Sequence, residues 1–306
     1  MRRHHPGGVV NLVVASTSVS AVLACATLGG GYAVCRRRST SGSTARALCF
    51  ATGLAAWLAV AVDPFATVAV QWFWARAVQV VVLLYLAPLC LALGAPLTVV
   101  RDALTPTART RLTRALASHS LRGLCAPPVT SAAMLALPWL LYLTGWYAAA
   151  LTNPAVGVAT TVALLVVGFA YFYARLQVDP VPRRYTPLLA IGISAVESLA
   201  DGVLGLVLWL GPVIATEYYG ALHRSGGPDP RTDQTLGAGI LWLLGDVLGI
   251  PFLLVLLRAL GRHERAQAQR VDAALDAERG VADSTSTEGT ALWWEQDPHL
   301  RERFRR

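Results

Sequence analysis

The sequence predicts an all-α, polytopic membrane protein with seven transmembrane helices, and two observations support this fold class. Of the 306 residues, 55% are hydrophobic and only 14% are charged, whereas a soluble domain carries about a quarter charged residues. The apolar residues also gather in runs long enough to cross the hydrocarbon core, which takes about 20 residues. The seven runs are 9–34, 47–70, 77–100, 129–151, 154–175, 187–213 and 236–260.

The arginines predict how these runs are oriented. The chain contains no lysine, and its arginines cluster after the first, third, fifth and seventh runs, while the alternate loops contain few. By the positive-inside rule, the odd runs therefore end in the cytoplasm. We expect the N-terminus outside, the C-terminus in the cytoplasm and the lipid bilayer as a partner. The net charge of +8 comes from arginines that lie largely beside the apolar runs. It is therefore weak evidence for nucleic-acid binding, and we expect no nucleic-acid partner.

The composition changes after the last run and predicts two parts. Residues 1–260 form the predicted seven-helix membrane domain, and residues 261–306 form a cytoplasmic tail. The tail opens with "RHERAQAQRVDAALDAER", which favours a helix with charges on most faces. It continues with "GVADSTSTEGT", a composition typical of disorder. We therefore expect a tail that is helical first and then largely disordered.

Four ionisable residues within or beside the apolar runs, together with Gln79, are candidate functional residues that we group as one predicted polar cluster. Glu197 and Asp201 are four apart, which places them on one helix face. Asp246 lies in the middle of the seventh run, and Arg76 opens the third. Ionisable groups inside a bilayer are costly and commonly mark ion or proton pathways. Two interpretations remain open: cation or proton handling, or an ion-paired network that holds the third, sixth and seventh spans together.

Prolines and glycine interrupt the third run, in "LYLAPLCLALGAPL". Pro88 and Pro96 each remove a backbone hydrogen-bond donor, and Gly94 between them permits close approach of another helix. We predict a kinked, centrally placed span. Asp63, which Pro64 follows, is interpreted as a boundary residue of the second run.

Several function classes are disfavoured by the residues themselves. A retinal protein needs a Schiff-base lysine, and a membrane b-type cytochrome needs histidines in the bilayer, whereas all six histidines lie outside the seven runs. The five cysteines lack metal-site spacing. The sequence also shows no nucleophile motif and no phosphate-binding glycine loop, so we do not expect an enzyme.

Several blocks of the sequence resemble one family. "LYLAPLCLALGAPLTVVRDAL", "GWYAAALTNP", "VVGFAYFYARLQVDPVPRR", "DQTLGAGILWLLGDVLGIP" and "RHERAQAQRVDAALD" follow in that order. Together they resemble the CtaG-like cytochrome c oxidase assembly proteins over about residues 45–275, with a seven-span plan. The matching positions that we interpret as kink or motif residues are Pro88, Gly94, Pro96, Asp179, Pro180, Asp233, Gln234, Gly237, Gly239, Trp242 and Gly245.

The resemblance implies a role in copper-centre biogenesis, but the expected histidines are missing. Where the family typically reads HMxQH, this chain reads Arg76 to Val80, and only Gln79 is retained. The position of a sixth-span histidine corresponds to Asp201. Imidazole suits copper, and Arg76 would repel a cation. We therefore expect no cofactor and no metal ligands. A copper site built from the remaining carboxylates with Cys90 and Met134 is the disfavoured alternative.

Two function hypotheses follow. The first is a multi-pass protein of a bacterial plasma membrane that helps to assemble cytochrome c oxidase. It would be scaffold-like, a diverged member without the usual metal site, with oxidase subunits or other assembly factors as partners. The alternative is a proton-coupled or small-solute transporter that uses Glu197, Asp201 and Asp246 as its polar path.

Overall fold

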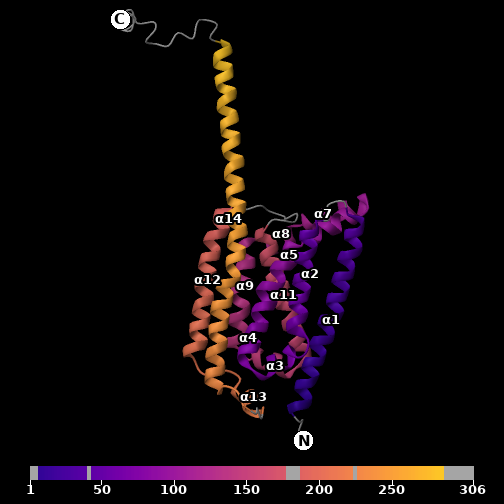
Figure 1. Cartoon of the computed structure of the whole chain (residues 1–306), viewed down its shortest axis with the longest axis vertical. Coiled ribbons are helices and arrows are strands. Elements are labelled where there is room, and N and C mark those ends of the chain that lie inside the picture. Colours follow the sequence, from indigo (N-terminus) through magenta and orange to yellow (C-terminus); the bar gives the residue numbers. More distant parts are fainter. Residues whose placement is uncertain (1–5, 40–42, 177–186, 223–225, 286–306) are drawn as a thin grey trace, which may run out of the picture. The chain divides into compact units, whose positions relative to one another are not determined.

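The computed structural model describes residues 6–39, 43–176, 187–222 and 226–285, and every regular element in these ranges is a helix. The chain divides into two compact units, Met1–Leu256 and Leu257–Arg306. Figure 1 shows the helices of the first unit packed side by side as a bundle. The candidate site lies within this unit.

The helices are named here in chain order with their bounds. They are α1 (Pro6–Arg38), α2 (Thr44–Ala61), α3 (Phe65–Gln71), α4 (Phe73–Val81), the π-helix η1 (Val82–Leu86), α5 (Ala87–Leu93), α6 (Pro96–Ala103), α7 (Pro106–Leu116), α8 (His119–Leu124), α9 (Pro127–Leu143), α10 (Trp146–Thr152), α11 (Pro154–Leu176), α12 (Pro187–Leu210), α13 (Thr216–Ala221) and α14 (Pro230–Thr285).

Four of the described segments are long and apolar enough to cross a membrane: α1, α2, the series from α4 to α6, and α11. A fifth is counted if the bent pair α9 and α10 is one span. The membrane character and the all-helical fold are thus confirmed. The sixth and seventh predicted runs lie in α12 and α14, where many side chains are outside the described part. The total of seven spans and the orientation of the termini therefore stay predictions.

Two of the predicted runs contain a break, and the first break lies at Asp63, the predicted boundary residue. The run 47–70 is split between α2 and α3 at Asp63, whose carboxylate accepts from the Thr67 backbone N–H at 3.2 Å. The run 129–151 is split at Thr144, with a bend of 73° between α9 and α10. The Thr144 hydroxyl accepts from the Trp146 backbone N–H at 3.2 Å. Apolar composition predicts which segments lie within the membrane. It does not predict these local caps, which end one helix and begin the next.

The third predicted span changes its helical form ahead of Pro88. Because Pro88 has no N–H, it cannot bind the carbonyl of Leu84, four residues earlier. The preceding turn is the π-helix η1, in which the Ala87 N–H bonds to the Val82 carbonyl, five residues back. The face bearing Leu84 is then met by Gly168 of α11, where a Cβ would lie 2.1 Å from the Leu84 carbonyl oxygen. The proline thus produces a surface that only glycine can approach.

The same span packs against α2 and is broken once more at its end. A Cβ on Gly53 would lie 2.9 Å from the Ala87 carbonyl oxygen, and a Cβ on Gly94 would lie 2.7 Å from the Phe50 Cβ. Buried Ala95 then adopts a left-handed conformation with φ of 49°, which residues other than Gly and Asn rarely occupy. Residues 94 and 95 therefore separate α5 from α6.

The two ends of the bundle differ in character. Helices α7 and α8 lie at the end where α1 finishes, whereas α3 and α13 lie at the opposite end (Figure 1). The exposed arginines Arg111 and Arg114 belong to α7. The opposite end, which we call the α3–α13 end, contains the polar contacts described below.

We expect Gly168→Ala to lower the free energy of unfolding by about 1–3 kcal/mol, because the added methyl meets a backbone carbonyl rather than a movable side chain. Thermal unfolding in one detergent, followed by intrinsic fluorescence, would measure this loss. Gly30→Ala on α1 is the matched control: its Cβ would meet no atom within 4 Å, so its stability should be unchanged or slightly raised. Equal melting temperatures for both variants would contradict the packing described.

Candidate functional site

The side chain of Asp229 caps the N-terminus of α14. Asp229 accepts hydrogen bonds from the Thr232 hydroxyl at 2.6 Å, and from the backbone N–H groups of Arg231 and Thr232, each at 3.1 Å. These bonds, those from Thr232 first, lower the pKa of the exposed Asp229 carboxyl. The cap fixes where α14 starts and therefore which face its next residues present to the bundle.

Asp233, one turn into α14, binds the beginning of α4. Its carboxylate is 1% exposed and accepts the backbone N–H of Phe73 at 3.1 Å and of Trp74 at 3.0 Å. The first N–H groups of a helix have no partner within the helix, and a negative charge there also complements the helix dipole. Asp233 therefore stabilises the start of α4 from a helix about 160 residues away in sequence.

Gln234, the next residue, binds the end of α12 and the loop that follows. Its amide nitrogen donates to the carbonyls of Leu208 at 2.8 Å and Pro212 at 2.9 Å. Its amide oxygen accepts the backbone N–H of Ile214 at 2.8 Å. One buried side chain thus satisfies three backbone groups where a helix ends.

Arg231 completes this arrangement on the exposed side. Its guanidinium donates to the carbonyls of Trp209 and Gly211, where a positive charge complements the C-terminal end of the α12 dipole. We call Arg231, Asp233 and Gln234 the α14 clasp. Two of its members belong to the "DQ" of the family-like block, and the clasp shows what these residues contact.

The next turns of α14 pack through two further residues of that block. A Cβ on Gly237 would lie 2.2 Å from the Phe73 ring, and a Cβ on Gly205 of α12 would lie 2.9 Å from the Trp242 Cβ. Gly239 has no neighbour within 4 Å of its Cβ position. Asp179 and Pro180 lie outside the described part of the chain. Gly245 belongs to α14, but its surroundings lie outside the described part.

Aromatic side chains gather next to the clasp. The Phe73 ring lies 5.7 Å from the ring of Tyr142 and 5.6 Å from that of Tyr147. The hydroxyls of Tyr147 and Tyr219 are 2.7 Å apart and hydrogen-bonded, and the Tyr218 hydroxyl donates to the Val70 carbonyl at 2.9 Å. We call Tyr142, Tyr147, Tyr218 and Tyr219 the tyrosine cluster. Burial raises the pKa of Tyr218, in the loop helix α13, to about 12, so this hydroxyl stays neutral at physiological pH.

Arg76 supplies a positive charge to this neutral cluster. It is 7% exposed and donates to the Gln79 amide oxygen at 2.6 Å, and Gln79 in turn donates to the Val60 carbonyl at 2.6 Å. The Arg76 guanidinium also interacts electrostatically with all four tyrosines. Its Nε is buried without a hydrogen-bond partner among the described residues.

The predicted polar cluster is therefore visible only in part. Arg76 and Gln79 are brought together, and no described carboxylate forms an ion pair with Arg76. The side chains of Glu197, Asp201 and Asp246 lie outside the described part, so their place in one cluster stays a prediction. The tyrosines were missed in the sequence analysis because they are neutral and lie in separate segments, without a motif that joins them.

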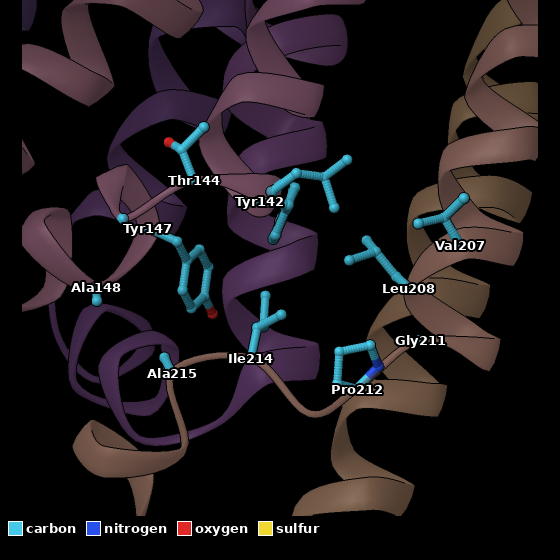
Figure 2. Close-up of a pocket in the computed structure, with 12 residues that line it drawn as sticks. Tyr142, Thr144, Tyr147, Ala148, Val207, Leu208, Gly211, Pro212, Ile214 and Ala215 are labelled. Carbon is cyan, nitrogen blue, oxygen red and sulfur yellow. The ribbon is translucent and has the colours of Figure 1, made fainter.

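A cavity of about 340 Å³ opens beside the tyrosine cluster (Figure 2). It lies between the junction of α9 and α10 on one side and the end of α12 with its following loop on the other. Its lining includes Tyr142, Tyr147, Leu208, Pro212 and Ile214. The clasp holds part of this wall, because Gln234 binds the backbone of three of these five residues.

The family model for the cytochrome c oxidase caa3 assembly factor matches residues 29–263. The chain belongs to this family. It is also 25% identical over 256 residues to uncharacterized proteins of Mycobacterium bovis and Mycobacterium tuberculosis, and 23% identical over 255 residues to one of Mycobacterium leprae. Each match covers 81% of this chain and 39% of the relative. No solved structure matches the chain.

Membership confirms the resemblance that the sequence blocks indicated. The matched region contains the clasp, Arg76 and the whole tyrosine cluster, so all of these contacts lie within the family domain. The chain spans about 39% of the length of the relatives it matches.

Asp233→Ala should lower the free energy of unfolding by about 1–3 kcal/mol, because it leaves the buried N–H of Phe73 and the partly buried N–H of Trp74 without an acceptor. The comparison is Asp63→Ala, which removes an exposed carboxylate that also accepts a backbone N–H and should cost about 1 kcal/mol or less. Thermal unfolding of both variants in one detergent would test the difference. If Asp233→Ala cost no more than Asp63→Ala, the clasp would not be a main stabilising contact.

Proposed function

We propose that this protein assists assembly of cytochrome c oxidase as a membrane scaffold that binds a partner protein, without carrying copper on its own intramembrane side chains. Family membership supports the assembly role. The partner would be an oxidase subunit or another assembly factor.

Arg76 is the observation on which the scaffold role depends. It occupies the position where the resemblance implies a copper-binding histidine, and it is a buried, permanently charged group. A copper ion beside it would meet a positive charge in a low-dielectric interior, where repulsion between like charges is strong. The described side chains with which Arg76 interacts are the Gln79 amide, by a hydrogen bond, and the four phenols, through its charge, and these are poor replacements for imidazole.

The polar residues of the family block bind backbone groups of neighbouring helices, as the clasp does. In this proposal the family's framework is kept for its shape, and copper remains a cargo handled by other proteins.

Deletion of the gene should lower terminal oxidase activity in membranes, and added copper in the medium should fail to restore it, because the missing step is protein assembly. The measurement is oxygen consumption with reduced cytochrome c, with and without copper, together with the oxidase subunit levels. Rescue by copper would show copper delivery instead, and unchanged activity in both media would remove the protein from oxidase assembly.

Complementation with point variants sharpens this test. Arg76→Lys keeps the positive charge and should restore much of the activity, whereas Arg76→Ala should restore less because it removes the bond to Gln79 and the charge beside the tyrosines. Arg37→Ala, exposed at the end of α1, is the control and should restore activity fully. Copper content of the purified wild-type protein should be well below one ion per chain.

A further inference from the structure

The helix α7 presents a basic face at one end of the bundle. Arg111 and Arg114 lie one turn apart, and both side chains are exposed. With Pro106, Thr107 and Thr110 they line a shallow hollow of about 390 Å³ along this helix. A guanidinium is always charged and carries several N–H donors in a fixed geometry. The hollow therefore offers two cations that can bind an oxyanion through hydrogen bonds.

No anion of the described part of the protein neutralises these two guanidinium groups. Asp102 forms its ion pair with the arginine that precedes it, at 3.2 Å, and neither Arg111 nor Arg114 has a hydrogen bond or an ion pair to a described residue through its guanidinium. In residues 1–178 the only acidic residues are Asp63 and Asp102, and Asp63 precedes α3 at the opposite end of the bundle (Figure 1). The two charges therefore remain available to an anion from outside the chain.

The hollow lies beside the end of an apolar span. The helical series Phe73–Ala103 is long and apolar enough to cross a membrane, and α7 begins shortly after it, at Pro106. Arg109 ties the two together, because its guanidinium donates to the carbonyls of Arg101 at 3.2 Å and Asp102 at 3.3 Å. Figure 1 shows α7 running across this end of the bundle. A basic helix held in this way lies at the level of the lipid headgroups.

We propose that the hollow binds the headgroup of an anionic phospholipid, with Arg111 and Arg114 donating to its phosphodiester oxygens while the acyl chains stay in the bilayer. Guanidinium groups suit phosphate, and anionic lipids attract basic segments beside a span. An acidic protein segment has the same charge, but the lipid is favoured because the end of the span already places its phosphate beside the hollow. The site does not depend on the proposed role in oxidase assembly.

The test measures lipid binding to the full chain, purified in a neutral detergent, by native mass spectrometry. Phosphatidylglycerol and phosphatidylcholine with identical acyl chains are titrated separately. We expect phosphatidylglycerol to bind more tightly, because only this lipid has a net negative charge. Millimolar inorganic phosphate should not displace it, because the free ion lacks the acyl chains that hold the lipid beside the span. The readout is independent of oxidase activity, so this proposal and the assembly role can fail separately.

Two double variants separate the hollow from the general charge of this end. Arg111→Gln with Arg114→Gln should weaken phosphatidylglycerol binding about twentyfold, at about fivefold for each arginine beside a headgroup, and should change phosphatidylcholine binding little. Arg37→Gln with Arg38→Gln is the matched control. These two arginines are exposed at the same end but do not line the hollow. Their loss should weaken binding less than about threefold, because solvent and salt screen more distant charges.

Three results would overturn the proposal. Equal weakening by the two double variants would show only a general attraction to the basic end. Displacement by inorganic phosphate would show a site for a free anion. A decaglutamate peptide that binds more tightly than phosphatidylglycerol, and no longer binds the Arg111→Gln, Arg114→Gln variant, would show a protein partner. Melting temperatures of both variants are recorded, and if the α7 double variant does not fold, Arg114→Gln alone decides, with an expected loss of about fivefold.

Discussion

Three side chains at the start of α14 form hydrogen bonds with backbone groups that lack a partner at the ends of two other helices. The geometry of the site depends on these three side chains. Asp233 accepts hydrogen bonds from the N–H groups that begin α4, while Gln234 and Arg231 donate to carbonyls at the end of α12. Unpaired backbone groups cost several kcal/mol each in a hydrocarbon environment, so these contacts fix the neighbouring segments in one arrangement. The charges also have the right signs, because the anion lies at a helix N-terminus and the cation at a C-terminus.

The consequences of the clasp extend to both the tyrosine cluster and the cavity. Holding the start of α4 sets the position of Phe73 and, one turn later, Arg76. Holding the end of α12 and its loop sets one wall of the cavity through Leu208, Pro212 and Ile214. A single turn of α14 therefore positions the buried charge and the pocket wall together, which gives the family motif a physical explanation.

A second constraint acts in the middle of the bundle, where backbones approach closely. The π-helix before Pro88 and the glycine at position 168 form one unit, because the proline alters the hydrogen bonding around Leu84 and only a residue without a side chain fits against it. Gly53 and Gly94 play the same part toward α2. Association of helices inside a bilayer relies on such close packing, since burial from water adds little there.

The sequence by itself determined the membrane character, the helical class, the family and the kink of the third span. These follow from local properties: apolar run length, arginine placement, proline chemistry and the short motif blocks. It also indicated a boundary at Asp63, and α2 ends just before that residue. It did not reveal the break at Thr144, because a short polar side chain caps a helix only in a particular backbone geometry. Nor did it reveal the contacts of Asp233 with Phe73 and Trp74, or the gathering of Tyr142, Tyr147 and Tyr219. Those residues are far apart in the chain and largely without a charge pattern, so only the packing of α14, α9 and α13 against α4 could bring them together.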